Sequence, residues 1–226
     1  MRAIFFVGLL LFSFGCSKSP EPATEPVAAE PVRTDPAPEV KPDNRPVIVA
    51  LGNSLSAGFG LDPGSSYPDF LQRELDGQGY QYRVVNAGIS GDTTSGGVDR
   101  LDSVLAHKPA IVILELGGND GLRGFPVSLT RANLEKMIVA LQAGGAKVVL
   151  AGITLPPNYG PAYIRDFENN YHELAREHRL PLIPFLLEGV ALVPGMMQRD
   201  GIHPTAQGNQ KVARTVLKVL VPLLTK

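Results

Sequence analysis

The sequence predicts an α/β protein whose parallel sheet is covered by helices on both faces. Short apolar runs rich in β-branched residues alternate with segments in which apolar residues recur at helical spacing. Unbroken apolar runs are typical of strands buried on both faces, which is the environment of a parallel sheet. Short connections between the two kinds of segment favour consecutive β-α units. At 226 residues and 44% hydrophobic content, the chain can bury one sizeable core, and we expect one domain over residues 46–226.

Five apolar runs are the expected strands. The first covers residues 47–51 and ends at Gly52, and the others cover residues 82–85, 110–116, 147–153 and 182–183. One helical stripe stands at i, i+3, i+4 and i+7 and is ended by a glycine pair, and another follows Pro204. The first stripe is Leu134, Met137, Ile138 and Leu141, and the second is Val212, Ala213, Val216, Leu217 and Leu220.

The first 45 residues predict export and anchoring. Residues 1–16 form a signal peptide, because Arg2 precedes an apolar stretch too short to span a bilayer. The segment ends at Cys16, the only cysteine, in a pattern that resembles a lipobox, although Ser13 and Phe14 depart from the usual Leu-small-Gly-Cys. Residues 17–45 contain seven prolines and no aromatic residue, which predicts a disordered tether.

These features predict an exported protein on the periplasmic side of a bacterial envelope, held in the membrane by a lipid on Cys16. Ser17 after the cysteine resembles lipoproteins of the outer membrane. The alternative is an ordinary signal peptide with a stray cysteine, which would leave a soluble periplasmic protein.

Composition and charge argue against several classes of partner. A net charge of -1 with no basic run gives no electrostatic reason to bind nucleic acid. A single cysteine excludes an internal disulfide. His107, His172 and His178 lie in or after charged helical segments, so we interpret them as surface residues and predict no metal site and no cofactor. We expect a monomer.

Polar turns follow the first three expected strands. Ser54 follows the first, residues 86–92 the second and residues 117–120 the third. Any one of them would ordinarily be only a turn or, for Ser54, a helix cap. Because the carboxyl ends of parallel strands meet at one edge of a sheet, the three turns together predict a functional site there.

The side chains near this edge match nucleophilic acyl transfer. Ser54 offers a hydroxyl nucleophile, and His203 and Asp200, three residues apart in a loop closed by a proline, offer an imidazole base and a carboxylate that orients it. The backbone N–H groups of Gly91 and Ser54 and the carboxamide of Asn119 are candidate donors to the oxyanion of a tetrahedral intermediate.

The same residues carry a resemblance to the SGNH hydrolases, also called the GDSL esterase/lipase family. The four blocks read Gly-Asn-Ser-Leu-Ser, Asn-Ala-Gly-Ile-Ser-Gly-Asp-Thr, Leu-Gly-Gly-Asn-Asp and Asp-Gly-Ile-His-Pro, in the family's order. The resemblance implies a flavodoxin-like three-layer α/β/α sandwich with a five-stranded parallel sheet. It also implies a triad of Ser54, His203 and Asp200 without metal or cofactor. Asn53 departs from the aspartate that the family usually has there, so we expect an altered local hydrogen-bond network.

Within the family, the chain is similar to the bacterial periplasmic thioesterase/lysophospholipase/arylesterase group. The likeness rests on residues 117–125 and 155–160. It implies a small acyl ester or lysophospholipid as substrate, thioesters included, with Leu155 and Pro156 lining an acyl channel. It further implies a mobile loop over the acyl chain, formed by Asp120, Gly121, Leu122, Arg123, Gly124 and Phe125.

Two other functions remain open on the sequence. The same blocks also occur in deacetylases that act on envelope carbohydrate. The length of the acyl channel would distinguish the two functions. Asn53 and the tether are also compatible with a non-catalytic envelope protein that binds lipid or a partner.

Overall fold

The computed structural model describes residues 43–226, so the predicted signal segment, Cys16 and residues 17–42 of the tether lie outside it. Asp43–Lys226 form one compact unit. Arg45 pairs with Asp43 at 2.7 Å and donates to the carbonyl of Tyr82 at 3.3 Å. The unit therefore starts slightly before residue 46.

The sheet confirms the predicted fold class. Five strands, all paired in parallel, lie in the order β2-β1-β3-β4-β5. They are β1 (Val47–Gly52), β2 (Arg83–Gly88), β3 (Ile111–Glu115), β4 (Lys147–Ala151) and β5 (Leu182–Ile183). Residues 86–88, expected in the second turn, belong to β2, because they continue the ladder opposite Ala50, Leu51 and Gly52 of β1.

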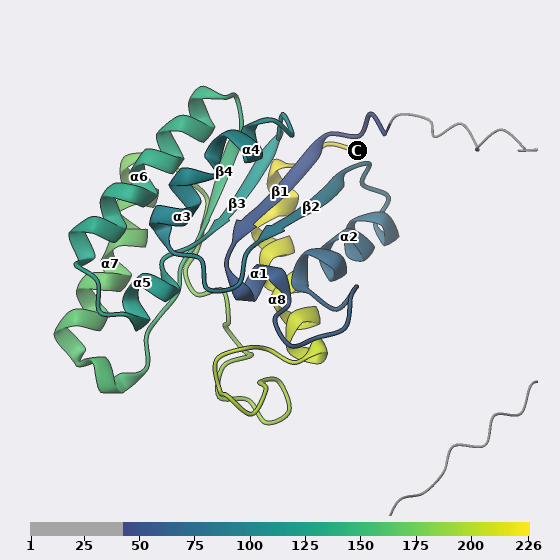
Figure 1. Cartoon of the computed structure of the whole chain (residues 1–226). Helices are drawn as coiled ribbons and strands as arrows, with labels where there is room; N and C mark the ends of the chain where they lie inside the picture. Colours follow the sequence, from purple (N-terminus) through teal and green to yellow (C-terminus); the bar gives the residue numbers. More distant parts are fainter. Residues whose placement is uncertain (1–42) are drawn as a thin grey trace, which may run out of the picture. The chain divides into compact units, whose positions relative to one another are not determined.

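Helices cover both faces of this sheet (Figure 1). One layer contains α2 (Tyr67–Gly77) packed against α8 (Ala206–Leu220), and the other contains α3 (Thr94–Asp99), α6 (Val127–Ala143) and α7 (Pro161–Glu177). Shorter helices are α1 (Ser54–Ala57), α4 (Leu101–Leu105), α5 (Gly118–Leu122), η1 (Pro157–Tyr159) and η2 (Val221–Leu223). Both predicted stripes are buried, in α6 and α8. Over residues 43–226, no helix has the length and apolar character needed to cross a bilayer.

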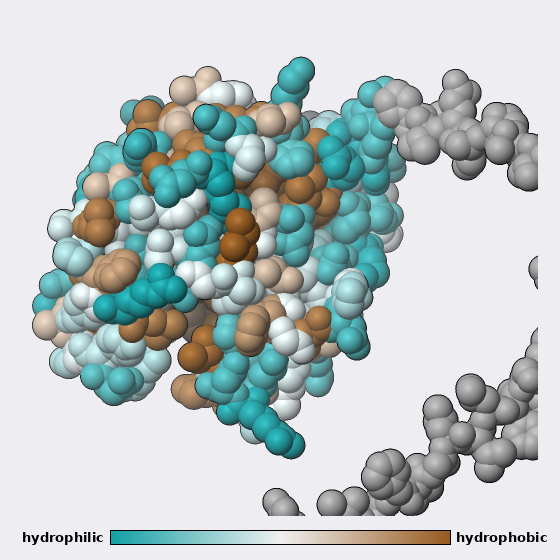
Figure 2. All heavy atoms as spheres, viewed as in Figure 1, coloured by the Kyte–Doolittle hydropathy of each residue, from teal (hydrophilic) through white to brown (hydrophobic). Residues whose placement is uncertain are grey.

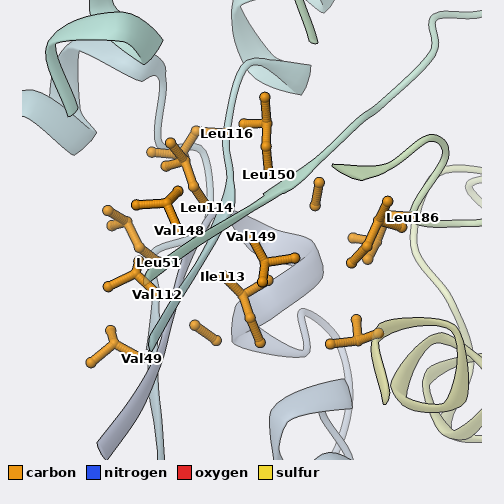
Figure 3. Close-up of a cluster of buried hydrophobic side chains, with 14 of the residues drawn as sticks. Val49, Leu51, Val112, Ile113, Leu114, Leu116, Val148, Val149, Leu150 and Leu186 are labelled. Atoms are coloured by element: carbon orange, nitrogen blue, oxygen red, sulfur yellow. The ribbon is translucent and has the colours of Figure 1, made fainter. Parts of the chain in front are cut away.

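The core follows the central strands. Every residue of β1 and β3 is buried, and Figure 3 shows side chains of β1, β3 and β4 clustered with Leu186. Strands buried along their whole length leave only their ends for chemistry. In this strand order the direction of winding reverses between β1 and β3, so a crevice opens beyond the carboxyl ends of these two strands.

Candidate active site

Ser54 lies at the carboxyl end of β1, as the first residue of α1. Asn53 caps this short helix, and its Oδ1 accepts the N–H of Leu55 at 2.9 Å. The turn is tight at Gly52, where an added Cβ would lie 2.0 Å from Ser56 Oγ and 2.4 Å from Glu115 Oε2. A side chain at this position would therefore displace Ser56 or Glu115.

A hydrogen-bonded chain connects Ser54, His203 and Asp200. Ser54 Oγ lies 2.8 Å from Nε2 of His203, 149 residues away, and His203 Nδ1 lies 2.6 Å from Asp200 Oδ2. Because Nδ1 faces a carboxylate it carries the ring proton, which leaves Nε2 free to accept the serine proton. The structure thus brings together the three side chains that the sequence singled out, in the order that nucleophilic attack requires.

Asp200 is held in its ionised form. Burial acts to raise its pKa, but hydrogen bonds from the His203 side chain and from the backbone N–H groups of His203 and Ile202 lower the pKa to about 2. The carboxylate is therefore charged at any pH at which a neutral imidazole could act as a base.

The loop that carries His203 is fastened to the segment after α1. The N–H of Gln198 donates to the His203 carbonyl at 2.7 Å, and Gln198 Nε2 donates to the carbonyls of Phe59 and Pro204 at 2.7 and 2.9 Å. The Phe59 ring centroid lies 4.6 Å from that of His203. Sequence reasoning missed Phe59 and Gln198, since neither stands in a motif.

The two predicted oxyanion turns are joined to each other. Asn119 Nδ2 donates to the carbonyl of Asp92 at 2.8 Å, and Arg123 donates to the carbonyl of Gly91 at 2.9 Å. A carboxamide has two N–H groups, so the bond to Asp92 leaves one for a substrate oxygen. Gly91 has a φ of 83°, a left-handed backbone conformation that residues with a side chain rarely adopt. Asn119 shares a cavity wall with Ser54.

Arg100 fastens the second turn to β1, and sequence reasoning also missed it. Its Nε pairs with Asp92 at 2.7 Å, and its other nitrogens donate to the carbonyls of Ala87 and Gly52 at 2.6 and 2.9 Å. The side chains of Arg100 and Asp92 are both largely buried. This ion pair holds the turn that carries Gly91 in place beside the turn that carries Ser54.

An apolar cavity of about 450 Å³ opens beside Ser54 and His203. Of the predicted substrate residues, Leu122, Leu155 and Pro156 line it. Figure 2 shows a hollow bordered by apolar side chains on the face seen there. Other apolar residues of the wall come from segments without a motif, which sequence reasoning missed, namely Ile153, Phe185, Leu187, Leu192 and Met197, while Ile202 comes from the block that carries His203.

The other residues expected over the acyl chain lie behind this wall or away from it. Asp120, Gly121, Arg123, Gly124 and Phe125 do not line the cavity. Asp120 is buried and accepts from the N–H and the hydroxyl of Thr94 at 2.9 and 2.5 Å, which joins α5 to α3. Hydroxyls of Tyr159 and Tyr163 donate to the carbonyls of Leu122 and Phe125 at 2.6 and 2.7 Å.

In the described part of the chain, one group of acidic and histidine side chains is close enough together to hold an ion. His178 Nε2 lies 3.4 Å from Glu135 Oε1 and close to Glu177. Glu177, however, pairs with Arg131 at 2.5 Å, so a positive charge already occupies its carboxylate. His107 and His172 are exposed, as predicted, while the side chain of His178 is largely buried against α6.

A parallel α/β/α sandwich with a Ser–His–Asp chain at its switch point is the architecture of a serine hydrolase. The chain belongs to the GDSL-like Lipase/Acylhydrolase family, whose model matches residues 50–211. The resemblance seen in the four sequence blocks is thereby confirmed, and the protein is a GDSL-type serine esterase.

Named relatives agree with this assignment. The chain is 49% identical over 178 residues to Esterase TesA of Pseudomonas aeruginosa, covering 78% of this chain and 89% of the relative. It is 42% identical over 178 residues to thioesterase 1/protease 1/lysophospholipase L1 of Escherichia coli, covering 78% and 84%. The fold also matches the crystal structure of the psychrotrophic esterase EstA from a Pseudoalteromonas species, inhibited by monoethylphosphonate, with a TM-score of 0.75. The two sequences are 33% identical, and the match covers 78% of this chain and 97% of EstA.

Proposed function

We propose that this esterase works through an acyl-enzyme on Ser54, with His203 as general base and Asp200 as the carboxylate that orients it. The observation that supports these roles is the unbroken chain from Ser54 Oγ through His203 to Asp200, with separations of 2.8 and 2.6 Å. Ser54 Oγ attacks the ester carbonyl carbon while its proton passes to His203 Nε2.

The negative charge that develops on the carbonyl oxygen is stabilised by donors from three turns. These are the N–H groups of Ser54 and Gly91 and the carboxamide of Asn119. Collapse of the intermediate breaks the bond to the leaving alcohol, which takes the proton from His203. A water then repeats the sequence at the acyl carbon and releases the acid with Ser54 regenerated.

We propose that the substrates are esters with an extended apolar acyl group, including lysophospholipids and the corresponding thioesters. The apolar wall of the cavity supports this class, because an acetyl group would leave most of about 450 Å³ unfilled. The names of the relatives, an esterase and a thioesterase/lysophospholipase, point to the same class.

Two measurements test this proposal. A fluorophosphonate should label the wild-type protein at Ser54, and absence of labelling would refute the acyl-enzyme. A series of p-nitrophenyl esters should show kcat/KM rising from the acetate toward longer chains. Fastest hydrolysis of the acetate would favour the carbohydrate deacetylase instead.

Leu192 should contribute to the preference for long chains. It lines the cavity mouth with a fully exposed side chain and a φ of 62°, a conformation rare for leucine. If an acyl chain covers half of this side chain, Leu192→Ser should lower kcat/KM for p-nitrophenyl decanoate by about 5- to 10-fold. The value of kcat/KM for p-nitrophenyl acetate should not change. Leu129→Ser, at an exposed position outside the cavity, is the matched control. An equal loss for all chain lengths would contradict this role.

We also propose that the enzyme is exported, anchored through a lipid on Cys16 and monomeric. The short apolar segment, the single cysteine and the proline-rich residues 17–45 support the anchor. All groups of the proposed site come from one chain, which supports a monomer.

Cys16→Ser should move the protein out of the membrane fraction or leave an unprocessed precursor, with unchanged esterase activity. Two or three acyl chains at about 0.8 kcal/mol per buried methylene make anchoring essentially permanent, and the substitution removes them all. Mass spectrometry of the mature wild-type N-terminus checks the modification. An unmodified chain that begins elsewhere would show a soluble periplasmic enzyme, in which the departures at Ser13 and Phe14 matter.

A further inference from the structure

A buried carboxylate lies directly behind the turn that carries Ser54. Glu115 is the last residue of β3, stands opposite Gly52 in the ladder and is fully buried in an otherwise apolar strand. Over residues 43–226 it forms no ion pair with any Lys, Arg or His. A buried acid without a cation is costly to retain, and nothing in the acyl-transfer steps uses it.

Glu115 contacts donors on both sides of the nucleophile. Its Oε2 accepts the backbone N–H of Asn53 at 3.2 Å and the hydroxyl of Ser56 at 2.8 Å. Tyr67 supports this bridge from α2, with its hydroxyl 3.2 Å from Ser56 Oγ. Oε1 is buried and has no hydrogen-bond partner among residues 43–226. One oxygen thus binds the two ends of the turn, while the other is left unsatisfied.

We propose that Glu115 is a positioning residue for Ser54, which holds the nucleophile's turn by bridging Asn53 and Ser56, and that its ionisation tightens this bridge. A charged acceptor makes shorter and stronger hydrogen bonds than a neutral one. An amide or apolar side chain here would avoid a buried charge, so the carboxylate costs stability that a role in catalysis explains. The inference rests on the proposed function, since it takes Ser54 as the nucleophile.

The electrostatic surroundings of Glu115 make it titrate near neutrality. Burial raises its pKa to about 7, against hydrogen bonds from Ser56 and Asn53 that lower it. The groups that face it are the phenols of Tyr67 on α2 and Tyr171 on α7, whose own pKa values are raised first by burial and then by the charge of Glu115. Arg100 binds the carbonyl of Gly52, on the same turn, rather than the carboxylate.

The raised pKa has a definite consequence for stability. Between the ordinary value of 4.5 and about 7, the folded protein binds more protons at Glu115 than the unfolded chain does. The free energy of unfolding therefore falls as pH rises through this window, and the full cost of the buried charge is present above pH 7. Glu115→Gln removes this cost while it keeps a carbonyl acceptor for the two donors.

The decisive experiment compares Glu115→Gln with wild-type enzyme and with Glu135→Gln, the same change on the surface of α6. The readouts are the rate of fluorophosphonate labelling of Ser54 from pH 5 to 9, kcat and KM for one ester, and Tm at pH 8. In Glu115→Gln we expect the labelling rate and kcat to fall about 10- to 100-fold, while KM changes little. Small misplacements of reacting groups reduce rates by factors of this size. Tm at pH 8 should equal or exceed that of the wild type.

The pH profile separates positioning from a merely structural role. Wild-type labelling should rise with pH through an ionisation near pH 7, that of Glu115, and this step should be missing from the profile of Glu115→Gln. Labelling as fast as the wild type, or a loss matched by loss of folded protein, would overturn the proposal. Wild-type protein that resists labelling would instead overturn the proposed function.

If Glu115→Gln does not fold, Ser56→Ala provides a second test. It removes one of the two donors and leaves the carboxylate and Asn53 in place. Slower labelling with an unchanged KM and a cooperative unfolding transition would support the bridge. An unchanged labelling rate would overturn it.

Discussion

Replacing Ser54 by alanine, or His203 by alanine, is expected to lower kcat by about 10⁶ while the fold stays intact. Without the hydroxyl there is no nucleophile, and without the imidazole its proton has no acceptor at 2.8 Å. Neither residue belongs to a buried apolar stripe, and the hydroxyl of Ser54 bonds only to His203 within residues 43–226. Hydrolysis of a p-nitrophenyl ester, measured alongside circular dichroism, checks both statements.

The double variant makes this prediction sharper. Groups that act as a unit are not additive, so Ser54→Ala combined with His203→Ala should be little slower than either single variant. His172→Ala, at an exposed histidine of α7, is the control and should retain full activity. A double variant much slower than both singles would mean that the two side chains act independently.

Asp200→Asn should lower kcat by up to about 10⁴, the second-largest effect expected in this protein. The amide can donate to Nδ1, which places the ring proton on Nε2 and blocks acceptance of the Ser54 proton. Because the Asp200 pKa is lowered to about 2, the loss should be the same at every pH at which the wild type is active.

Stability measurements on Asp200→Asn supply an independent check. A depressed pKa contributes stability above the ordinary value of 3.8 that is lost as pH falls toward about 2. The difference in stability between wild type and variant should therefore shrink over this acidic interval and stay constant above it. Full activity of Asp200→Asn would assign the third role in the triad to another residue.

Local patterns were sufficient for the architecture and for the candidate catalytic side chains. Apolar runs and helical stripes depend on neighbours within a few residues, so strands β1 and β3 and the buried faces of α6 and α8 were predicted correctly. Ser54 and the pair of Asp200 and His203 were recognisable because each stands in a short motif at the end of an element. The rule that parallel strands end at one edge predicted that the turns of Ser54, Gly91 and Asn119 meet. That Asp200 and His203 join Ser54 was expected from their chemistry and from the family resemblance, because their loop does not directly follow a strand.

Groups that act through packing could be found only once the chain was folded. Gln198, which holds the His203 loop, bonds to Phe59 across 139 residues of sequence. Arg100 bonds to Gly52 across 48 residues. Residues 86–88 read as a turn but extend β2, because pairing with β1 outweighs their local preference. Glu115 carried the one overlooked signal, an acid inside an apolar run. Glu115 meets its two partners around Ser54 across 62 and 59 residues of sequence, a contact between distant segments that no local pattern records. The loops that wall the acyl cavity come together in the same way.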